Sequence, residues 1–223
     1  MKKYLVIGNP INHSLSPKLH NHWIKQNHLN AIYEKKKLDK NEIEKLISEI
    51  KQRNISGVNV TVPFKNSVVP YLDELSDEAK KTQAVNTVYL KDEKVIGHNT
   101  DTVGFEKAIK KINFNFNNKK IFIIGAGGVV PSIIYSSIKM GASEIFITNR
   151  TKIKAKKIKD IFNNIVLVNW GDMPNFDVVI NATSLGLNKD DKINLDFSKT
   201  GKNKLFYDVI YNPSETNFLN TGK

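Results

Sequence analysis

The sequence has 223 residues, of which 40% are hydrophobic and 25% are charged, as in ordinary globular proteins. No apolar run is long enough to span a bilayer or to form the core of a signal peptide, and the lack of cysteine excludes disulfides and thiolate metal ligands. The formal net charge of +12 could serve nucleic-acid binding, but the lysines are spread along the chain without interleaved aromatic residues. We therefore expect a cytoplasmic protein that binds neither nucleic acid nor membranes.

The N-terminal stretch predicts a short buried strand over 2–7, a Gly-Asn-Pro turn and a helix over 18–27. Ser16 before Pro17 is a natural helix start, because a serine hydroxyl can cap free amides and proline suits the first turn. Ser14 and Ser16 together also suit the binding of a carboxylate, since hydroxyls and backbone amides converge at a helix N-terminus. Both interpretations of Ser16 stay open at this point.

Two more strands are predicted over 31–38 and 57–62, separated by an amphipathic helix that starts near Asp39. The resulting β-α-β-α-β order indicates a parallel sheet covered by helices.

In the third strand, valines alternate with Asn59 and Thr61, and Pro63 should end the strand. Lys65 follows at the strand end, where ligand sites of parallel sheets collect. A polar strand face that leads to a single ammonium is typical of a small-molecule site. The alternative is an ordinary strand with a surface lysine.

A mostly helical region is expected up to Lys81, followed by a strand pair over 85–90 and 94–97. Polar clusters flank this pair, with Asn86 before it and Asp101 after it. Asp101 either caps the helix predicted over 102–112 or belongs to the site.

The low-complexity patch 113–118 is the best linker candidate, and it precedes a buried strand over 121–124. That strand runs directly into Gly125, Ala126, Gly127 and Gly128 and then into a helix. Strand, glycine loop and helix in this order are the context of a dinucleotide-binding fingerprint. Its third small position is Val130, which is bulkier than usual and should alter the packing of helix on sheet.

The next strand, over 144–148, ends at Asn149, Arg150 and Thr151. An acidic residue here would hold the ribose hydroxyls of NAD, whereas arginine is expected for the 2′-phosphate of NADP. The chain has only one other arginine, Arg53, so position 150 uses what lysine lacks, a planar guanidinium that grips phosphate with two hydrogen bonds. Lys154 can add charge one helical turn later. The alternative is a plain surface arginine.

Two further strands are predicted over 177–180 and 205–209. The first leads into a small, polar loop over 181–186 that suits a position over a cofactor. The second leads into Tyr211.

These blocks, in this order, closely resemble the shikimate dehydrogenase family. The matching stretches are GNPINHSLSP at 8–17, NVTVPFK at 59–65, AVNT at 84–87, NTD at 99–101, GAGG at 125–128, NRT at 149–151, NATS at 181–184 and DVIYNP at 208–213. The resemblance implies an α/β protein with an open α/β substrate domain over 1–101 and a Rossmann-type NADP-binding domain over 102–223. It also implies the NADPH-dependent reduction of 3-dehydroshikimate to shikimate in aromatic amino acid biosynthesis, without a metal.

The resemblance also implies roles for single residues. Lys65 with Asp101 would form the catalytic pair, although the sequence does not decide which of them transfers the proton. Substrate contacts would come from Ser14, Ser16, Thr61, Asn86 and Tyr211. Cofactor contacts would come from Asp77, Gly125, Ala126, Gly127, Gly128, Asn149, Arg150, Thr151, Lys154 and Val209. The molecule would act as a monomer or homodimer.

One departure concerns the C-terminus, because family members continue with a glutamine that reaches the substrate and with helices that pack back on the first domain. The sequence indicates either a fragment or a short protein whose substrate site lacks a wall, and in the second case NADP binding should survive better than turnover. A quinate/shikimate dehydrogenase and a non-catalytic nucleotide-binding protein stay as alternatives.

Overall fold

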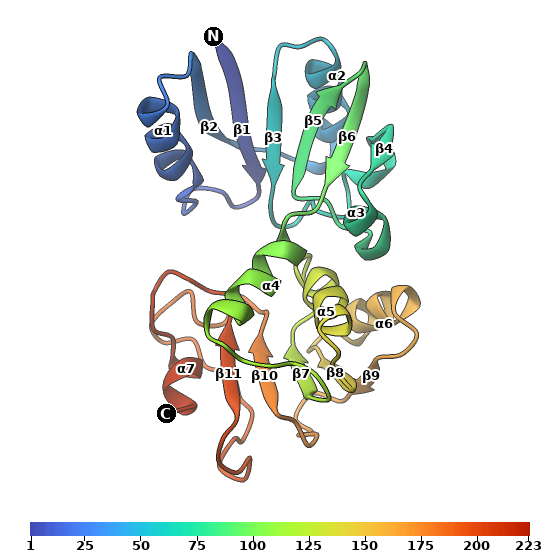
Figure 1. The fold of residues 1–223 in the computed structure, drawn as a ribbon, viewed down its shortest axis with the longest axis vertical. Helices are drawn as coiled ribbons and strands as arrows, with labels where there is room; N and C mark the ends of the chain where they lie inside the picture. The colour runs from blue at the N-terminus through green and yellow to red at the C-terminus, as the bar shows by residue number, and fades with distance from the viewer. The chain divides into compact units, whose positions relative to one another are not determined.

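The computed structural model describes residues 1–223, which form two compact units, Met1–Asp101 and Thr102–Lys223. Each unit is a β-sheet flanked by helices (Figure 1). The α/β class predicted from the sequence is therefore confirmed. None of the helices is long and apolar enough to cross a membrane.

The first unit is built on a six-stranded sheet with the order β2-β1-β3-β5-β6-β4. Its strands are β1 (Lys2–Gly8), β2 (Ala31–Lys37), β3 (Gly57–Val60), β4 (Glu74–Leu75), β5 (Thr87–Lys91) and β6 (Lys94–His98). β2 and β3 run parallel to β1 on either side of it, whereas β5 is antiparallel to both β3 and β6. The predicted parallel β-α-β-α-β arrangement and the predicted strand pair are both present.

Helices cover both faces of this sheet. They are α1 (Ser16–Gln26), α2 (Ile43–Lys51) and α3 (Asp77–Thr82), with the 3-10 turns η1 (Lys40–Glu42) and η2 (Val69–Tyr71). Leu5 and Ile7 of β1 belong to the large core that α2 closes, while Val6 packs on the opposite face with Tyr33 of β2 and Ile24 of α1. A strand that is buried on both faces has a continuous apolar sequence, and this explains why β1 could be predicted from the sequence.

The strand that ends before Lys65 is shorter than predicted. β3 stops at Val60, and the Val62 side chain is 56% exposed rather than on the apolar face. The cause is a turn in which the Phe64 N–H donates to the Thr61 carbonyl oxygen at 2.9 Å and the Phe64 ring enters the core.

The prediction of a mostly helical region up to Lys81 is wrong. Only α3 and the 3-10 turn η2 are helical there, and β4 adds a short parallel strand to the sheet edge. Pro70 removes one backbone donor, and the Asp73 carboxylate accepts a hydrogen bond from the Val95 N–H at 2.7 Å. This contact ties the segment to β6, so sheet pairing outweighs local helix propensity.

The second unit contains a five-stranded sheet in which all strands are parallel. Its strands are β7 (Lys120–Ile124), β8 (Glu144–Thr148), β9 (Val166–Val168), β10 (Val178–Asn181) and β11 (Leu205–Asp208). Its helices are α4 (Asp101–Lys111), α5 (Val130–Lys139), α6 (Lys152–Ile161) and α7 (Asn217–Thr221). The order β11-β10-β7-β8-β9 reverses between β7 and β10, which is the topology of a doubly wound nucleotide-binding sheet.

The patch 113–118 is not a linker, contrary to the prediction. It lies inside the second unit, and Phe116 is 1% exposed. The Phe116 ring meets Phe105 and Phe114 edge to face, with each pair of ring centroids 5.9 Å apart. Asn113 and Asn118 adopt positive φ angles that asparagine tolerates. The asparagines of this patch therefore form turns around the buried Phe116 ring.

We expect Phe116→Ala to lower the free energy of unfolding by about 3–5 kcal/mol, because a fully buried ring is replaced by a cavity. The exposed last residue of α4 provides the control: Lys111→Ala should change the free energy little. Urea unfolding of both variants measures the difference. A near-neutral Phe116→Ala would contradict the placement of this ring in the core.

Candidate active site

The predicted substrate residues gather at one edge of the first sheet. The strand order of this sheet reverses between β1 and β3, and in open α/β sheets ligands bind outside the carboxyl ends of strands at such a point. Ser14 and Ser16 follow β1, and Thr61 and Lys65 follow β3. Residues about fifty positions apart in the sequence therefore share this edge.

Asn86 and Asp101 reach the same edge because β5 runs against its neighbours. Asn86 directly precedes β5, and Asp101 follows β6, which is antiparallel to β5. The backbone confirms the placement: the Val60 N–H donates to the Asn86 carbonyl oxygen at 2.8 Å, and the Asn86 N–H donates to the His98 carbonyl oxygen at 3.0 Å.

Lys65 and Asp101 form an ion pair with 2.7 Å between Nζ and Oδ2. Their side chains are only 11% and 22% exposed, so water screens the pair weakly. The second carboxylate oxygen, Oδ1, accepts a hydrogen bond from Asn86 Nδ2 at 2.9 Å. At the start of α4, it is the Asn99 side-chain oxygen that accepts the Asp101 N–H, at 3.0 Å. The Asp101 carboxylate is thus bonded to Lys65 and Asn86, and the interpretation of Asp101 as only a helix cap is not supported.

The two serines lie at the start of α1, but Ser16 does not cap it. The cap position is Leu15, and Ser16 is the first helical residue. The Ser14 hydroxyl oxygen accepts the Ser16 N–H at 3.3 Å, so Ser14 takes the role expected of Ser16. Thr61 packs against Gly8: a Cβ at Gly8 would lie 2.7 Å from the Thr61 methyl group and 2.9 Å from the Val62 carbonyl oxygen. This close approach of two strand ends requires glycine at position 8.

Three further predicted residues belong to other elements of the chain. Asp77 is exposed in the first turn of α3. Val209 and Tyr211 follow β11 in the second unit, where Val209 packs on the core and Tyr211 is 68% exposed. Within the first unit, no hydrogen bond joins Asp77 to the Lys65–Asp101 pair.

The glycine loop lies at the reversal point of the second sheet, between the carboxyl ends of β7 and β10. Gly125 has a φ of +118°, and a Cβ there would lie 2.7 Å from the Ala182 carbonyl oxygen, so no other residue fits. Gly127 is exposed, and a Cβ on it would meet only that same oxygen at 3.7 Å, so the loop backbone stays open on its outer side. Val130 at the third fingerprint position is fully buried in the core.

The turn after β8 presents positive charge to solvent. Asn149 Nδ2 donates to the Thr151 carbonyl oxygen at 2.9 Å and so fixes the turn. Arg150 and Lys154 are exposed, and Arg150 forms no salt bridge. A fixed turn with an unneutralised guanidinium suits an anion such as a phosphate.

A polar cluster joins the ends of β10 and β11, two segments that stand in family motifs but whose hydrogen bonds to each other were not predicted. Asn181 Nδ2 lies 3.1 Å from both oxygens of Asp208, and the Thr216 hydroxyl donates to Asp208 Oδ2 at 2.7 Å. The Asn181 side-chain oxygen accepts the Thr183 N–H and hydroxyl. These bonds hold the loop after β10 and the segment that carries Tyr211. Only the polarity of residues 181–184 could have indicated this.

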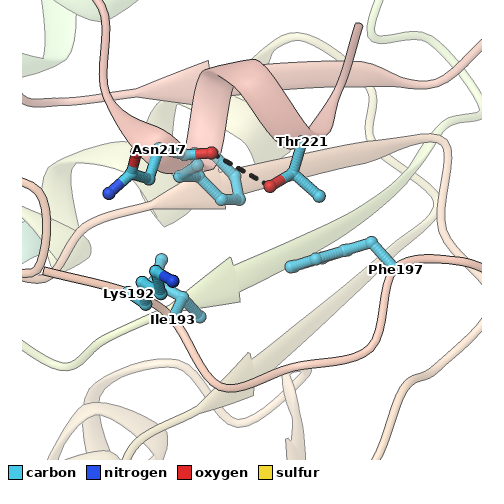
Figure 2. Close-up of a pocket in the computed structure, with 6 residues that line it drawn as sticks. Lys192, Ile193, Phe197, Asn217 and Thr221 are labelled. Atoms are coloured by element: carbon cyan, nitrogen blue, oxygen red, sulfur yellow. Dashed lines mark hydrogen bonds between the residues drawn. The ribbon is translucent and has the colours of Figure 1, made fainter. Parts of the chain in front are cut away.

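A cavity of about 280 Å³ lies elsewhere in the second unit, lined by Lys192, Ile193, Phe197, Asn217, Phe218 and Thr221. Figure 2 shows that the Thr221 hydroxyl donates across its edge to the Asn217 carbonyl oxygen. None of the predicted site residues lines this cavity. We therefore assign it no part in the site.

Comparison with known proteins identifies the family. The model of the shikimate dehydrogenase substrate binding domain matches residues 6–88, and that of shikimate / quinate 5-dehydrogenase matches residues 106–211. The chain belongs to the shikimate dehydrogenase family. The shikimate dehydrogenase (NADP(+)) of Pelagibacter ubique is 54% identical over 222 residues, which cover 100% of this chain and 84% of that protein.

Solved structures agree with this assignment. The crystal structure of shikimate dehydrogenase from Aquifex aeolicus matches with a TM-score of 0.90 at 37% identity, covering 100% of this chain and 83% of that one. The enzyme from Thermus thermophilus in complex with NADP(H) and shikimate matches with a TM-score of 0.86 at 28% identity, covering 99% and 83%.

The Tyr33 phenol lies on the same face of the first sheet as Asn59, and its burial predicts a pH dependence of stability. Burial raises the pKa of Tyr33 above its ordinary value of 10.0, and a hydrogen bond with the Ser16 side chain offsets part of that rise. The folded state therefore keeps this proton at pH values where the unfolded chain has lost it. We expect the free energy of unfolding to fall as the pH rises above 10, by at most about 1.4 kcal/mol per pH unit from this group.

Tyr33→Phe should flatten that decline, and Tyr71→Phe, which removes an exposed hydroxyl and leaves Tyr33 in place, should not. Urea unfolding between pH 9 and 11, on the order of one pH unit either side of the free phenol's pKa, gives the slopes. Equal slopes for the wild type and Tyr33→Phe would contradict the burial of this phenol.

Proposed function

We propose that this chain catalyses the NADPH-dependent, reversible reduction of 3-dehydroshikimate to shikimate. Family membership supports the reaction and the cofactor. The observation that carries the proposal is the Lys65–Asp101 pair, shielded from solvent at the edge of the sheet where ligands bind. Steady-state oxidation of shikimate with NADP and with NAD tests it, and quinate as a second substrate tests the quinate/shikimate alternative.

The chemistry assigns separate tasks to the two members of the pair. When bound, NADPH supplies a hydride to the carbonyl carbon of the substrate. Negative charge then develops on the carbonyl oxygen, and the Lys65 ammonium stabilises it and donates a proton. Asp101 accepts a hydrogen bond from Lys65 Nζ and so holds the ammonium in place. In shikimate oxidation, Lys65 takes the proton back.

Substrate binding is proposed for the polar groups around the pair. Ser14 and Ser16 at the start of α1 would bind the substrate carboxylate, because hydroxyls and helix N-terminal amides favour an anion. Thr61 and Asn86 would contact ring hydroxyls, as would Asp101. Tyr211 is proposed as a further substrate contact from the second unit, on the strength of its place in the family motif.

Cofactor binding is proposed for the second unit, over residues 102–223. Gly125 to Gly128 would bind the pyrophosphate through their open backbone, ahead of the N-terminus of α5. Asn149, Arg150, Thr151 and Lys154 would hold the 2′-phosphate end, and Asp77 and Val209 are weaker candidates. The cytoplasmic location and the monomeric or homodimeric state that the sequence suggests also stay predictions.

Lys65→Ala should lower kcat for shikimate oxidation by about a hundred-fold or more, the usual scale for losing a proton-transfer group. The matched control is Lys94→Ala, which removes a lysine–carboxylate pair with Glu74 whose side chains are 58% and 51% exposed. That variant should keep the wild-type kcat, since exposed pairs contribute little. A Lys65→Ala enzyme with normal kcat would refute the proposed chemistry.

Arg150→Ala should raise the KM for NADP roughly ten- to a hundred-fold and leave the KM for NAD nearly unchanged, because only NADP carries a 2′-phosphate. Arg53→Ala serves as the control, since the only other arginine pairs with Glu93 on the surface of the first unit. Steady-state kinetics with both cofactors measure the effect. Equal losses with NADP and NAD would remove Arg150 from the phosphate site.

A further inference from the structure

A chain of side-chain hydrogen bonds crosses the first sheet and ends at Asp101. The Tyr33 hydroxyl donates to Asn59 Oδ1 at 2.7 Å, and Asn59 Nδ2 donates to the Thr87 hydroxyl oxygen at 3.1 Å. The Thr87 hydroxyl donates to Asn86 Oδ1 at 3.1 Å, and Asn86 Nδ2 donates to Asp101 Oδ1 at 2.9 Å. The chain thus links β2, β3 and β5 to the carboxylate that holds Lys65.

Every bond in this chain points the same way, and two groups that can only accept, the Asp101 carboxylate and the Asn86 backbone carbonyl, force that direction. A carboxylate only accepts, so Asn86 must present its NH₂ group to Asp101. Its oxygen then faces the Thr87 hydroxyl and also accepts the Thr100 N–H at 3.0 Å. Asn59 Nδ2 also donates to the Asn86 backbone carbonyl at 3.3 Å, so the oxygen of Asn59 is left to face Tyr33. The Tyr33 hydroxyl donates its single proton to that oxygen and so completes the hydrogen bonding of the Asn59 amide.

Tyr33 is held rigidly at the start of the chain. It is 4% exposed and lies in the small core between β1 and α1. Its ring stacks on His20 with 4.1 Å between centroids and 4° between planes, and the Asn21 side chain bonds both the N–H and the carbonyl of Tyr33. Burial raises the pKa of Tyr33, so the hydroxyl keeps its proton beyond the pH at which an exposed tyrosine loses it.

We propose that Tyr33 is a positioning residue for the Lys65–Asp101 pair, acting through the Asn59–Thr87–Asn86 chain. The inference rests on the proposed function. Tyr33 touches no reacting atom in this account. Its hydroxyl holds the Asn59 amide, which holds the Thr87 hydroxyl against Asn86. Asn86 in turn holds the carboxylate that binds the Lys65 ammonium. Removing the hydroxyl leaves Asn59 Oδ1 without its donor, so the Asn59 amide can shift and its hydrogen bond to the Thr87 hydroxyl loosens.

The test measures the single-turnover rate constant for shikimate oxidation at saturating shikimate and NADP. This rate constant excludes product release and does not depend on the fraction of folded enzyme. Tyr33→Phe and Thr87→Val should each lower it about three- to tenfold, the scale of one neutral hydrogen bond. The KM for NADP should not change. Because both variants break the same chain, the double variant should be no slower than the slower single variant.

Two control variants separate positioning from packing. Tyr4→Phe removes a hydroxyl from the strand neighbour of Tyr33 in the same small core, where it forms no hydrogen bond, and should keep the wild-type rate. Thr87→Ser keeps the hydroxyl that Thr87→Val lacks and should also keep it, so the chain is tested even if Tyr33→Phe folds poorly.

Three results would overturn the inference: an unchanged rate in Tyr33→Phe, equal losses in Thr87→Ser and Thr87→Val, or losses that multiply in the double variant. Each of these would leave the proposed function intact, provided that Lys65→Ala is inactive. A fully active Lys65→Ala would instead refute the proposed function itself.

Discussion

The shielded pair of Lys65 and Asp101 imposes a constraint on the whole first unit. Taking a lysine and a carboxylate out of water carries a desolvation cost, which their mutual attraction offsets only with good geometry and further hydrogen bonds. Asn86 supplies one such bond to Asp101, and the β5 and β6 backbones fix Asn86 in turn. The antiparallel pair β5–β6 extends the parallel strands of this sheet and brings Asn86 and Asp101 to the same edge as Lys65.

The same topological device operates twice in the chain. In each sheet the strand order reverses next to the first strand of the unit, β1 or β7, and the loop after that strand carries candidate residues. Glycine marks each reversal for a steric reason, since Gly8 lies against Val62 and Gly125 against Ala182. Backbone segments that approach this closely leave no room for a Cβ, and their polar groups face the ligand edge.

The parts of the fold that the sequence predicted are those with strong local signals. β1 and β7 are predicted by their continuous apolar runs. The glycine loop is predicted by its run of glycines directly after a strand. The errors fall where tertiary contacts override composition: the asparagine-rich patch around Phe116 encloses a core aromatic ring, and the segment before α3 is drawn to the sheet edge by Asp73.

The candidate site shows the same division between local and long-range signals. Lys65, Asn86 and Asp101 stand in recognisable motifs, so their proximity could be anticipated. Tyr33 could not, because it lies in an edge strand of unremarkable composition, and its link to Asn59 exists only because the Tyr33 side chain reaches across β1 to β3. Hydrogen-bond chains between strands depend on the register in which the strands pair, and the sequence of one strand alone does not determine that register.

The two candidate subsites also differ in how their charges are handled. In the proposed reaction Lys65 keeps its position while a proton moves. Its charge is matched by Asp101 within the first unit. Arg150 is exposed and has no acidic partner, so its charge remains available to an incoming anion. A lysine at a carbonyl needs only a compact, movable proton, whereas a phosphate is held best by the planar fork of a guanidinium. In a chain with 34 basic residues, the physical demand of each subsite thus accounts for a lysine at one and one of only two arginines at the other.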